Sequence, residues 1–103
     1  MFARIGIWQG SREELEKWIV RSREHNKPNI AQDAGLKAVY WLADRGAGKG
    51  MIVTLWENEQ AMKASEAAAL KRQAGTTGST GAKVTTERYE VVDSLLAHGQ
   101  GPE

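Results

Sequence analysis

Two segments of the sequence, Leu36–Ala43 and Met51–Trp56, are apolar on both faces that a β-strand would present. Side chains alternate between the two faces of a strand, so a sheet with one face in water shows alternating apolar and polar residues. In the second segment the apolar residues fall on both sides, with Met51, Val53 and Leu55 alternating with Ile52 and Trp56. A fold built from these strands must therefore cover both faces of its sheet.

The sequence predicts six elements in the order β-α-β-β-α-β. Phe2–Gln9 alternates as a strand, and Ser11–Glu14 has the form of a capping box that begins a helix. We expect this helix to end near Asn26, because Pro28 disfavours helical geometry in the residue before it. The remaining elements are strands at Leu36–Ala43 and Met51–Trp56, a helix at Glu59–Gln73 and a strand at Val84–Val92. This order predicts an α+β, ferredoxin-like fold, an antiparallel four-stranded sheet with two helices on one face.

Two helices can cover only one face of such a sheet, so the other apolar face needs a different cover. The simplest cover is the same sheet of a second copy. We therefore expect a homodimer in which the two sheets face each other and form an α/β barrel. We also expect the more uniformly apolar side of the first strand to face the first helix, with Ala3, Ile5 and Ile7 meeting Leu15, Trp18 and Ile19.

The composition indicates a soluble globular domain. Hydrophobic residues make up 41% and charged residues 26% of the chain, and the net charge of +1 gives no electrostatic reason to expect a nucleic-acid or membrane partner. The sequence has no cysteine, which excludes disulfides and thiolate sites. No apolar run approaches the ~20 residues of a membrane span, and we expect a cytoplasmic location. Residues 1–93 are expected to form one domain and residues 94–103 a flexible tail.

The chain also carries segments that occur together in known proteins: Ala3-Arg4-Ile5 leading to Gln9-Gly10-Ser11, then Ala34-Gly35-Leu36-Lys37, Val53-Thr54-Leu55-Trp56-Glu57-Asn58-Glu59-Gln60-Ala61 and Arg88-Tyr89-Glu90-Val91-Val92. They resemble the dimeric α/β-barrel superfamily, in particular its antibiotic-biosynthesis-monooxygenase-like and stress-responsive branches. The resemblance covers most of residues 2–93, and its most specific motif is the strand that ends in Trp-Glu and runs into a helix. It implies the fold and the homodimer, whereas fold alone does not fix function.

Haem-degrading members of this superfamily place a Trp, an Asn on the first strand and a His on the second helix beside the haem. The Trp corresponds to Trp56, but the Asn position falls at Ala3 and Glu59–Gln73 contains no His. Glu66 or a neighbour stands where the His would be needed. We therefore expect neither haem degradation nor a cofactor, and no His/Asp/Glu set has the spacing of a metal site.

Cofactor-independent monooxygenases of the same superfamily need less machinery, because an electron-rich phenolic substrate supplies a carbanion to O2 within a dry apolar pocket. The resemblance implies such an oxygenase acting on a small aromatic or polyketide-like molecule. The alternative is a non-catalytic small-ligand-binding or stress-response protein of the same fold. No catalytic residue is identified, and the candidate substrate-binding residues are Trp56, Trp18, Tyr40, Tyr89 and His25.

Each candidate also has a structural explanation. Trp56 could brace the third strand against the second helix, and the tryptophans could anchor a dimer interface. His25 lies near a helix C-terminus, where the helix dipole favours a His. We expect a ligand site between the sheet and the two helices, with Trp56 in its wall. The loop Gly75–Gly81 lacks the motif and the strand-to-helix setting of a phosphate loop, so it is expected to be a connection or a lid.

Overall fold

The computed structural model describes residues 1–66, 83–95 and 97. Its strands are β1 (Phe2–Gln9), β2 (Leu36–Asp44), β3 (Lys49–Trp56) and β4 (Lys83–Glu90). Its helical segments are α1 (Arg12–Arg21), η1 (Ser22–Asn26), α2 (Lys27–Ile30) and residues 59–66. The rest of the predicted helix up to Gln73, the loop Gly75–Gly81 and, of the tail, residues 96 and 98–103 lie outside the described residues.

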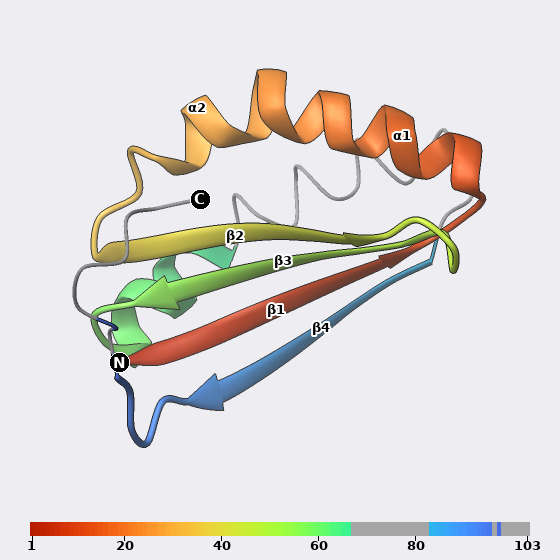
Figure 1. Ribbon diagram of the computed structural model, residues 1–103. Coiled ribbons are helices and arrows are strands. Elements are labelled where there is room, and N and C mark those ends of the chain that lie inside the picture. The colour runs from red at the N-terminus through yellow and green to blue at the C-terminus, as the bar shows by residue number, and fades with distance from the viewer. Residues whose placement is uncertain (67–82, 96, 98–103) are drawn as a thin grey trace.

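The four strands form one antiparallel sheet in the order β2-β3-β1-β4, and the helices pack on one of its faces (Figure 1). On that face α1 places Trp18 against Trp8 of β1. The helix at residues 59–66 places Met62 and Ser65 beside Arg4 of the same strand. The predicted ferredoxin-like α+β fold is confirmed. None of the helices among the described residues is long and apolar enough to cross a membrane.

The capping box predicted at the start of the first helix is present. Ser11 Oγ accepts from the Glu14 backbone N–H at 3.1 Å, and Glu14 Oε1 accepts from the Ser11 backbone N–H at 3.0 Å. These two bonds satisfy donors that a helix N-terminus otherwise leaves unpaired. The box fixes where α1 begins, and the helix then buries Leu15 and Trp18 against the sheet.

The first helical region continues past Asn26, where we expected it to end. η1 is a π-helix, in which the Lys27 N–H donates to the carbonyl of Ser22, and α2 follows with Pro28 in its first turn. Proline lacks an N–H, and its ring clashes with the carbonyl four residues earlier in a regular α-helix. The wider π turn ahead of Pro28 relieves this conflict, so a single helical run lies along β2 (Figure 1).

The side of β1 that faces the helices is the opposite of the one that we expected. Arg4 lies opposite Thr54 and Trp8 lies opposite Gly50, and all four residues are buried on the helix side. The residues that we expected there, Ala3, Ile5 and Ile7, lie on the other face and do not meet Leu15, Trp18 and Ile19. Trp8 accounts for the reversal, because an indole buries more apolar surface against α1 than an Ile side chain would.

The sheet face opposite the helices is apolar and partly exposed. We call it the open face, and its apolar and aromatic residues are Ala3, Ile5, Ile7, Ala38, Tyr40, Leu42, Met51, Val53, Leu55 and Tyr89. Thr85 and Glu87 of β4 lie on the same face. Tyr40, Leu42 and Tyr89 are 56%, 47% and 52% exposed. Both faces of β3 are therefore apolar, as its sequence indicated, and the described helices pack on only one of them.

Candidate functional site

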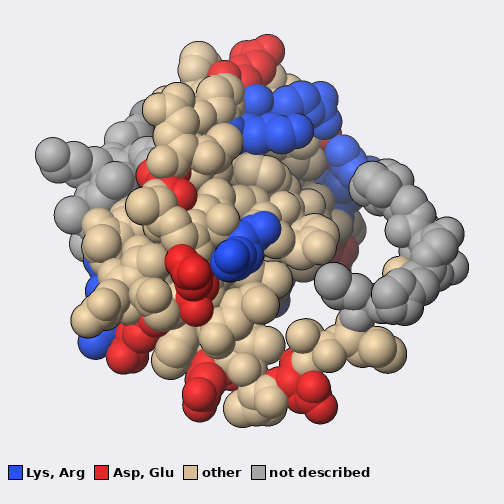
Figure 2. All heavy atoms as spheres, turned by 90° about the vertical axis from the view of Figure 1, so that its left-hand side faces the viewer, with Lys and Arg blue, Asp and Glu red and all other residues tan. Residues whose placement is uncertain are grey.

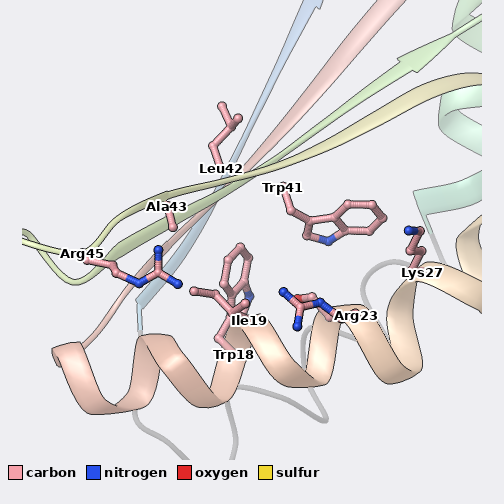
Figure 3. Close-up of a pocket in the computed structure, with 9 residues that line it drawn as sticks. Trp18, Ile19, Arg23, Lys27, Trp41, Leu42, Ala43 and Arg45 are labelled. Atoms are coloured by element: carbon pink, nitrogen blue, oxygen red, sulfur yellow. The ribbon is translucent and has the colours of Figure 1, made fainter. Parts of the chain in front are cut away.

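A cavity of about 340 Å³ lies between the helical run and β2. We call it the α1–β2 cavity, and it is lined by Trp18, Ile19, Ser22, Arg23, Lys27, Trp41, Leu42, Ala43 and Arg45. Figure 3 shows Trp41 reaching from β2 toward the helix and Trp18 rising from α1, with Arg23 and Lys27 near Trp41 and Arg45 beyond Ala43. The cavity is on the helix side of the sheet, but Trp56, which we expected in the wall of a ligand site, does not line it.

Two tryptophans give the cavity its aromatic walls. Trp18 is buried and stacks on Trp8 at a centroid distance of 5.9 Å and an interplanar angle of 23°. Its ring also lies directly against the backbone of Gly50, where a Cβ atom would come within 2.6 Å of it. Trp41 is half-buried and packs against this cluster from β2. Trp18 is thus held rigidly in place, as a stacking surface for a flat ligand must be.

Two polar atoms enclosed by these walls have no partner among the described residues. They are Ser22 Oγ and Trp41 Nε1. Buried polar groups are normally hydrogen-bonded, because leaving one unpaired loses the bonds that water would have made. Both residues line the cavity, so a ligand seated there could supply the missing partner.

The charged side chains that line the cavity are Arg23, Lys27 and Arg45. Arg45 is bound by Glu16, with Nε 2.7 Å from Oε2, and the hydrogen bond lowers the pKa of Glu16 and raises that of Arg45. Among the described residues no carboxylate pairs with Arg23 or Lys27. The rim of the cavity is therefore basic.

Trp56, the most informative residue of the sequence, is fully buried outside this cavity. Its Nε1 donates to Thr54 Oγ1 at 2.8 Å, and the Arg4 guanidinium lies over its ring. Arg4 in turn donates to the Met62 carbonyl and to Ser65 Oγ. A ligand could reach the Trp56 ring only if these neighbours moved.

The other candidate residues are spread over the molecule. Tyr40 and Tyr89 lie on the open face, and the hydrogen bond from Tyr89 to Glu87 raises the pKa of the Tyr89 phenol, which disfavours it as a base near neutral pH. His25 is exposed on η1, beside a shallow surface hollow next to α1. Of the five candidates only Trp18 lines the α1–β2 cavity.

Sequence reasoning missed Trp41, Ser22, Arg23 and Lys27. For Trp41 a signal existed, because it alternates with Tyr40 on a strand whose two faces are both apolar. For the three helix residues the signal was hidden, because the expected end of the helix at Asn26 left no reason to place Lys27 beside Ser22. Among the described residues no group of three or more His, Asp or Glu side chains could hold a metal ion.

Comparison of the sequence with protein-family models and with curated proteins finds no match. The fold, however, is that of antibiotic-biosynthesis-monooxygenase-like ferredoxin-fold proteins. A protein from Deinococcus radiodurans assigned to the antibiotic biosynthesis monooxygenases is 18% identical, with a TM-score of 0.79 over 96% of this chain and 100% of that one. SnoaB, a cofactor-independent oxygenase from Streptomyces nogalater, is 13% identical, with a TM-score of 0.66 over 91% of this chain and 95% of SnoaB.

Two further solved structures show how widely this fold is used. The haem degrader MhuD from Mycobacterium tuberculosis, solved with two haems in its active site, is 19% identical with a TM-score of 0.73, covering 92% of this chain and 99% of MhuD. A dimeric ferredoxin-like protein from an uncultured marine organism is 15% identical with a TM-score of 0.71, covering 93% of this chain and 98% of that one. At these identities the likeness establishes the fold alone.

Proposed function

We propose that this protein is a cofactor-independent oxygenase that acts on a small aromatic or polyketide-like molecule bound in the α1–β2 cavity. The observation that carries the proposal is the pair of tryptophans, Trp18 and Trp41, lining one cavity beside a basic rim. Aromatic walls with a few placed polar groups are typical of sites for flat ligands. The shared fold with SnoaB makes oxygenase chemistry the first activity to test.

The reaction would use the substrate's own electrons. Loss of a proton from an electron-rich anthrone-type CH2 gives a carbanion, which forms a C–O bond with O2; protonation gives a hydroperoxide. Breaking the O–O bond and the remaining C–H bond releases water and leaves a ketone. The substrate carbon supplies the four electrons that reduce O2. Among the described residues no carboxylate or imidazole lines the cavity, so the proton would leave to solvent while Arg23 and Lys27 stabilise the anion.

Haem degradation is disfavoured by the residues themselves. The segment Glu59–Gln73 contains no His to bind iron, and Ala3 stands at the Asn position. Ala3 also lies on the open face, away from Trp56, and the Trp56 ring is covered by Arg4. The residues present do not fit a haem group at this position, and no step is assigned to one.

A second function, non-catalytic binding of the same kind of ligand, is favoured by one observation. The described side chains that line the cavity include no general base, since they are aromatic, aliphatic, hydroxyl or cationic. A binding or stress-response protein would need only the aromatic walls and the basic rim. The two functions therefore share a site and differ in turnover.

The test is oxygen uptake with 1,8-dihydroxyanthrone, an electron-rich anthrone. The protein should consume O2 faster than the spontaneous reaction and form the anthraquinone, identified by mass spectrometry. Trp41→Ala should lower this rate by roughly tenfold through loss of stacking, whereas Trp41→Phe should retain most of it. Saturable binding with no uptake above the spontaneous rate would establish the non-catalytic function. Absence of both binding and uptake would contradict the site itself.

We also propose that the open face pairs with a second copy of the chain. Its Tyr40, Leu42 and Tyr89 would otherwise leave a contiguous apolar surface in water. The fold shared with a dimeric ferredoxin-like protein supports this arrangement. The dimer would leave the α1–β2 cavity on the opposite side of the sheet.

A further inference from the structure

We infer that the α1–β2 cavity takes an anion, a planar aromatic molecule that carries a carboxylate. The inference rests on the proposed function, which puts the ligand in this cavity. It adds the charge of the ligand and the residues that recognise that charge. Three independent features of the lining carry it: its charges, its unpartnered polar atoms and the helix geometry that brings them together.

The charges of the lining are one-sided. The chain has 14 basic and 13 acidic residues, yet in the part of the chain that the structure describes every charged side chain lining the cavity is basic. Arg23 and Lys27 stand four positions apart on one helical run, a spacing at which like charges repel. Figure 2, which views the molecule from the end near α2, shows Lys and Arg side chains grouped near the top of the view, the side of the helical run. A bound anion would offset this repulsion.

The uncharged polar side chains of the lining also favour an acceptor. An indole N–H can only donate, so Trp41 Nε1 can be satisfied by an acceptor alone. Ser22 is 2% exposed, and its hydroxyl, which can donate or accept, has no partner among the described residues. Lysine and arginine only donate as well. A carboxylate, which offers two acceptor oxygens and no donor, complements this set, whereas a neutral amide would bring donors of its own.

The π-helix explains how these groups come to face one cavity. In an α-helix residues five apart point about 140° away from each other, so Ser22 and Lys27 would lie on different faces. In η1 the Lys27 N–H instead bonds the Ser22 carbonyl, which places Lys27 one π turn above Ser22. Single π turns inside helices occur often at functional sites. Here the turn brings the hydroxyl and the two cations to the side of Trp41.

The size of the cavity limits the aromatic part. A volume of about 340 Å³ is near the lower end for ligand sites, which suits two or three fused rings rather than a macrocycle. With the rings against Trp18 and Trp41, the carboxylate would lie at the Arg23 and Lys27 end of the cavity (Figure 3). The probe pair that isolates the charge is therefore 2-naphthoate and 2-naphthamide, which share the ring system and differ in the anionic group.

The experiment is calorimetric titration of both probes, with the indole N–H resonance of Trp41, assigned by its loss in Trp41→Phe, followed by NMR. We expect 2-naphthoate to bind at least tenfold more tightly than 2-naphthamide, with weaker binding at high salt, and to shift the Trp41 resonance. In the double variant Arg23→Gln/Lys27→Gln this preference should disappear while binding of 2-naphthamide is retained.

A matched control removes the same charge at the same spacing elsewhere on the helix. Lys17→Gln/Arg21→Gln changes two cations four residues apart that border the shallow hollow beside α1 and do not line the cavity, so it should keep the preference. Equal affinity for the two probes, or a preference that survives in Arg23→Gln/Lys27→Gln, would overturn the anion inference and leave the aromatic site intact. If neither probe binds, the site of the proposed function fails with it. Tight binding of 2-naphthoate without oxygen uptake from the anthrone would support the inference and remove only the oxygenase activity.

Discussion

The guanidinium of Arg4 lies over the indole ring of Trp56, with Cζ 5.3 Å from the ring centroid. Both side chains are buried, and Arg4 Nη1 donates to the Met62 carbonyl at 3.2 Å and to Ser65 Oγ at 2.8 Å. Trp56 Nε1 donates to Thr54 Oγ1 at 2.8 Å. The cation–π contact thus joins β1 to β3, and the hydrogen bonds of Arg4 join both strands to the helix at residues 59–66. These contacts give Trp56 a structural role in the core.

This role implies a large loss of stability on truncation. Trp56→Ala should lower the free energy of unfolding by about 3–5 kcal/mol, because it removes a fully buried indole. Arg4→Met should cost about 1–3 kcal/mol through its lost hydrogen bonds, while Arg12→Met, at an exposed position on α1, serves as the control. Urea unfolding measures all three. Trp56→Phe should keep the affinity for 2-naphthoate, and a selective loss of that affinity would make Trp56 part of the ligand site.

The order of elements could be predicted because each depends on a local signal. Alternating residues and the capping box at Ser11 each act over a few residues, and the structure has both. The side of β1 that packs against the helices could not be predicted, because both of its sides carry large apolar residues. Only the contact between Trp8 and Trp18 decides which side the helices cover, and that contact joins residues ten positions apart in different elements.

The α1–β2 cavity lies on the helix side of the sheet, but few of the residues that line it were candidates from the sequence. Of the five candidate residues only Trp18 lines this cavity, and on β2 the candidate was Tyr40, whereas its neighbour Trp41 lines the cavity. The basic rim could not be predicted from the sequence, because an ordinary solvent-exposed helix face also carries scattered Lys and Arg residues. A π turn has no clear sequence signature, and only the turn at Ser22 brings Lys27 to the cavity.

The close packing of Trp18 on Gly50 gives a second test. A Cβ atom at position 50 would lie 2.6 Å from the Trp18 ring, closer than real Cβ atoms approach. Gly50→Ala should displace the ring, lower stability by about 1–3 kcal/mol and weaken naphthoate binding. Gly46→Ala is the matched control, because its Cβ would meet only Asp44 Oδ1 at 3.5 Å, an ordinary contact. Crystal structures or indole NMR shifts of Trp18 would report the movement; equal stability of the two variants would contradict it.

The capping box makes stability depend on pH in a defined direction. The hydrogen bonds with Ser11 lower the pKa of Glu14 below its ordinary value of 4.5. A carboxyl with a lowered folded-state pKa adds stability above its unfolded pKa, and that contribution is lost as the pH falls through the folded pKa. Glu14→Gln should therefore be less stable than the parent near neutral pH, and the gap should close at pH values below 4.5.

Thermal unfolding followed by circular dichroism across this pH range measures the gap. Glu13→Gln is the control, since it removes the same charge from the first turn of α1 without breaking the capping box. A gap between Glu14→Gln and the parent that stays constant down to the acid limit would mean that the Glu14 charge has no part in the cap.

The open face should govern the oligomeric state. Gel filtration with light scattering should give about twice the chain mass of 11.3 kDa at micromolar concentration. Val53 lies near the middle of the open face on β3, a central strand, and Val53→Asp would bury an unpaired carboxylate at the interface. The expected product is a monomer or an unfolded chain, because the charge leaves no favourable way to close the two sheets together.

The matched control is Val20→Asp, the same substitution on the solvent side of α1, where the valine is 48% exposed. It should remain dimeric and folded. Because Val53→Asp could unfold the chain, Tyr40→Ser provides a milder change at the exposed edge of the same face. This variant should weaken the dimer, while its far-ultraviolet circular dichroism should stay that of the parent. A parent protein that is monodisperse and monomeric at these concentrations would contradict the dimer, and the apolar surface of β2 and β3 would then need another partner.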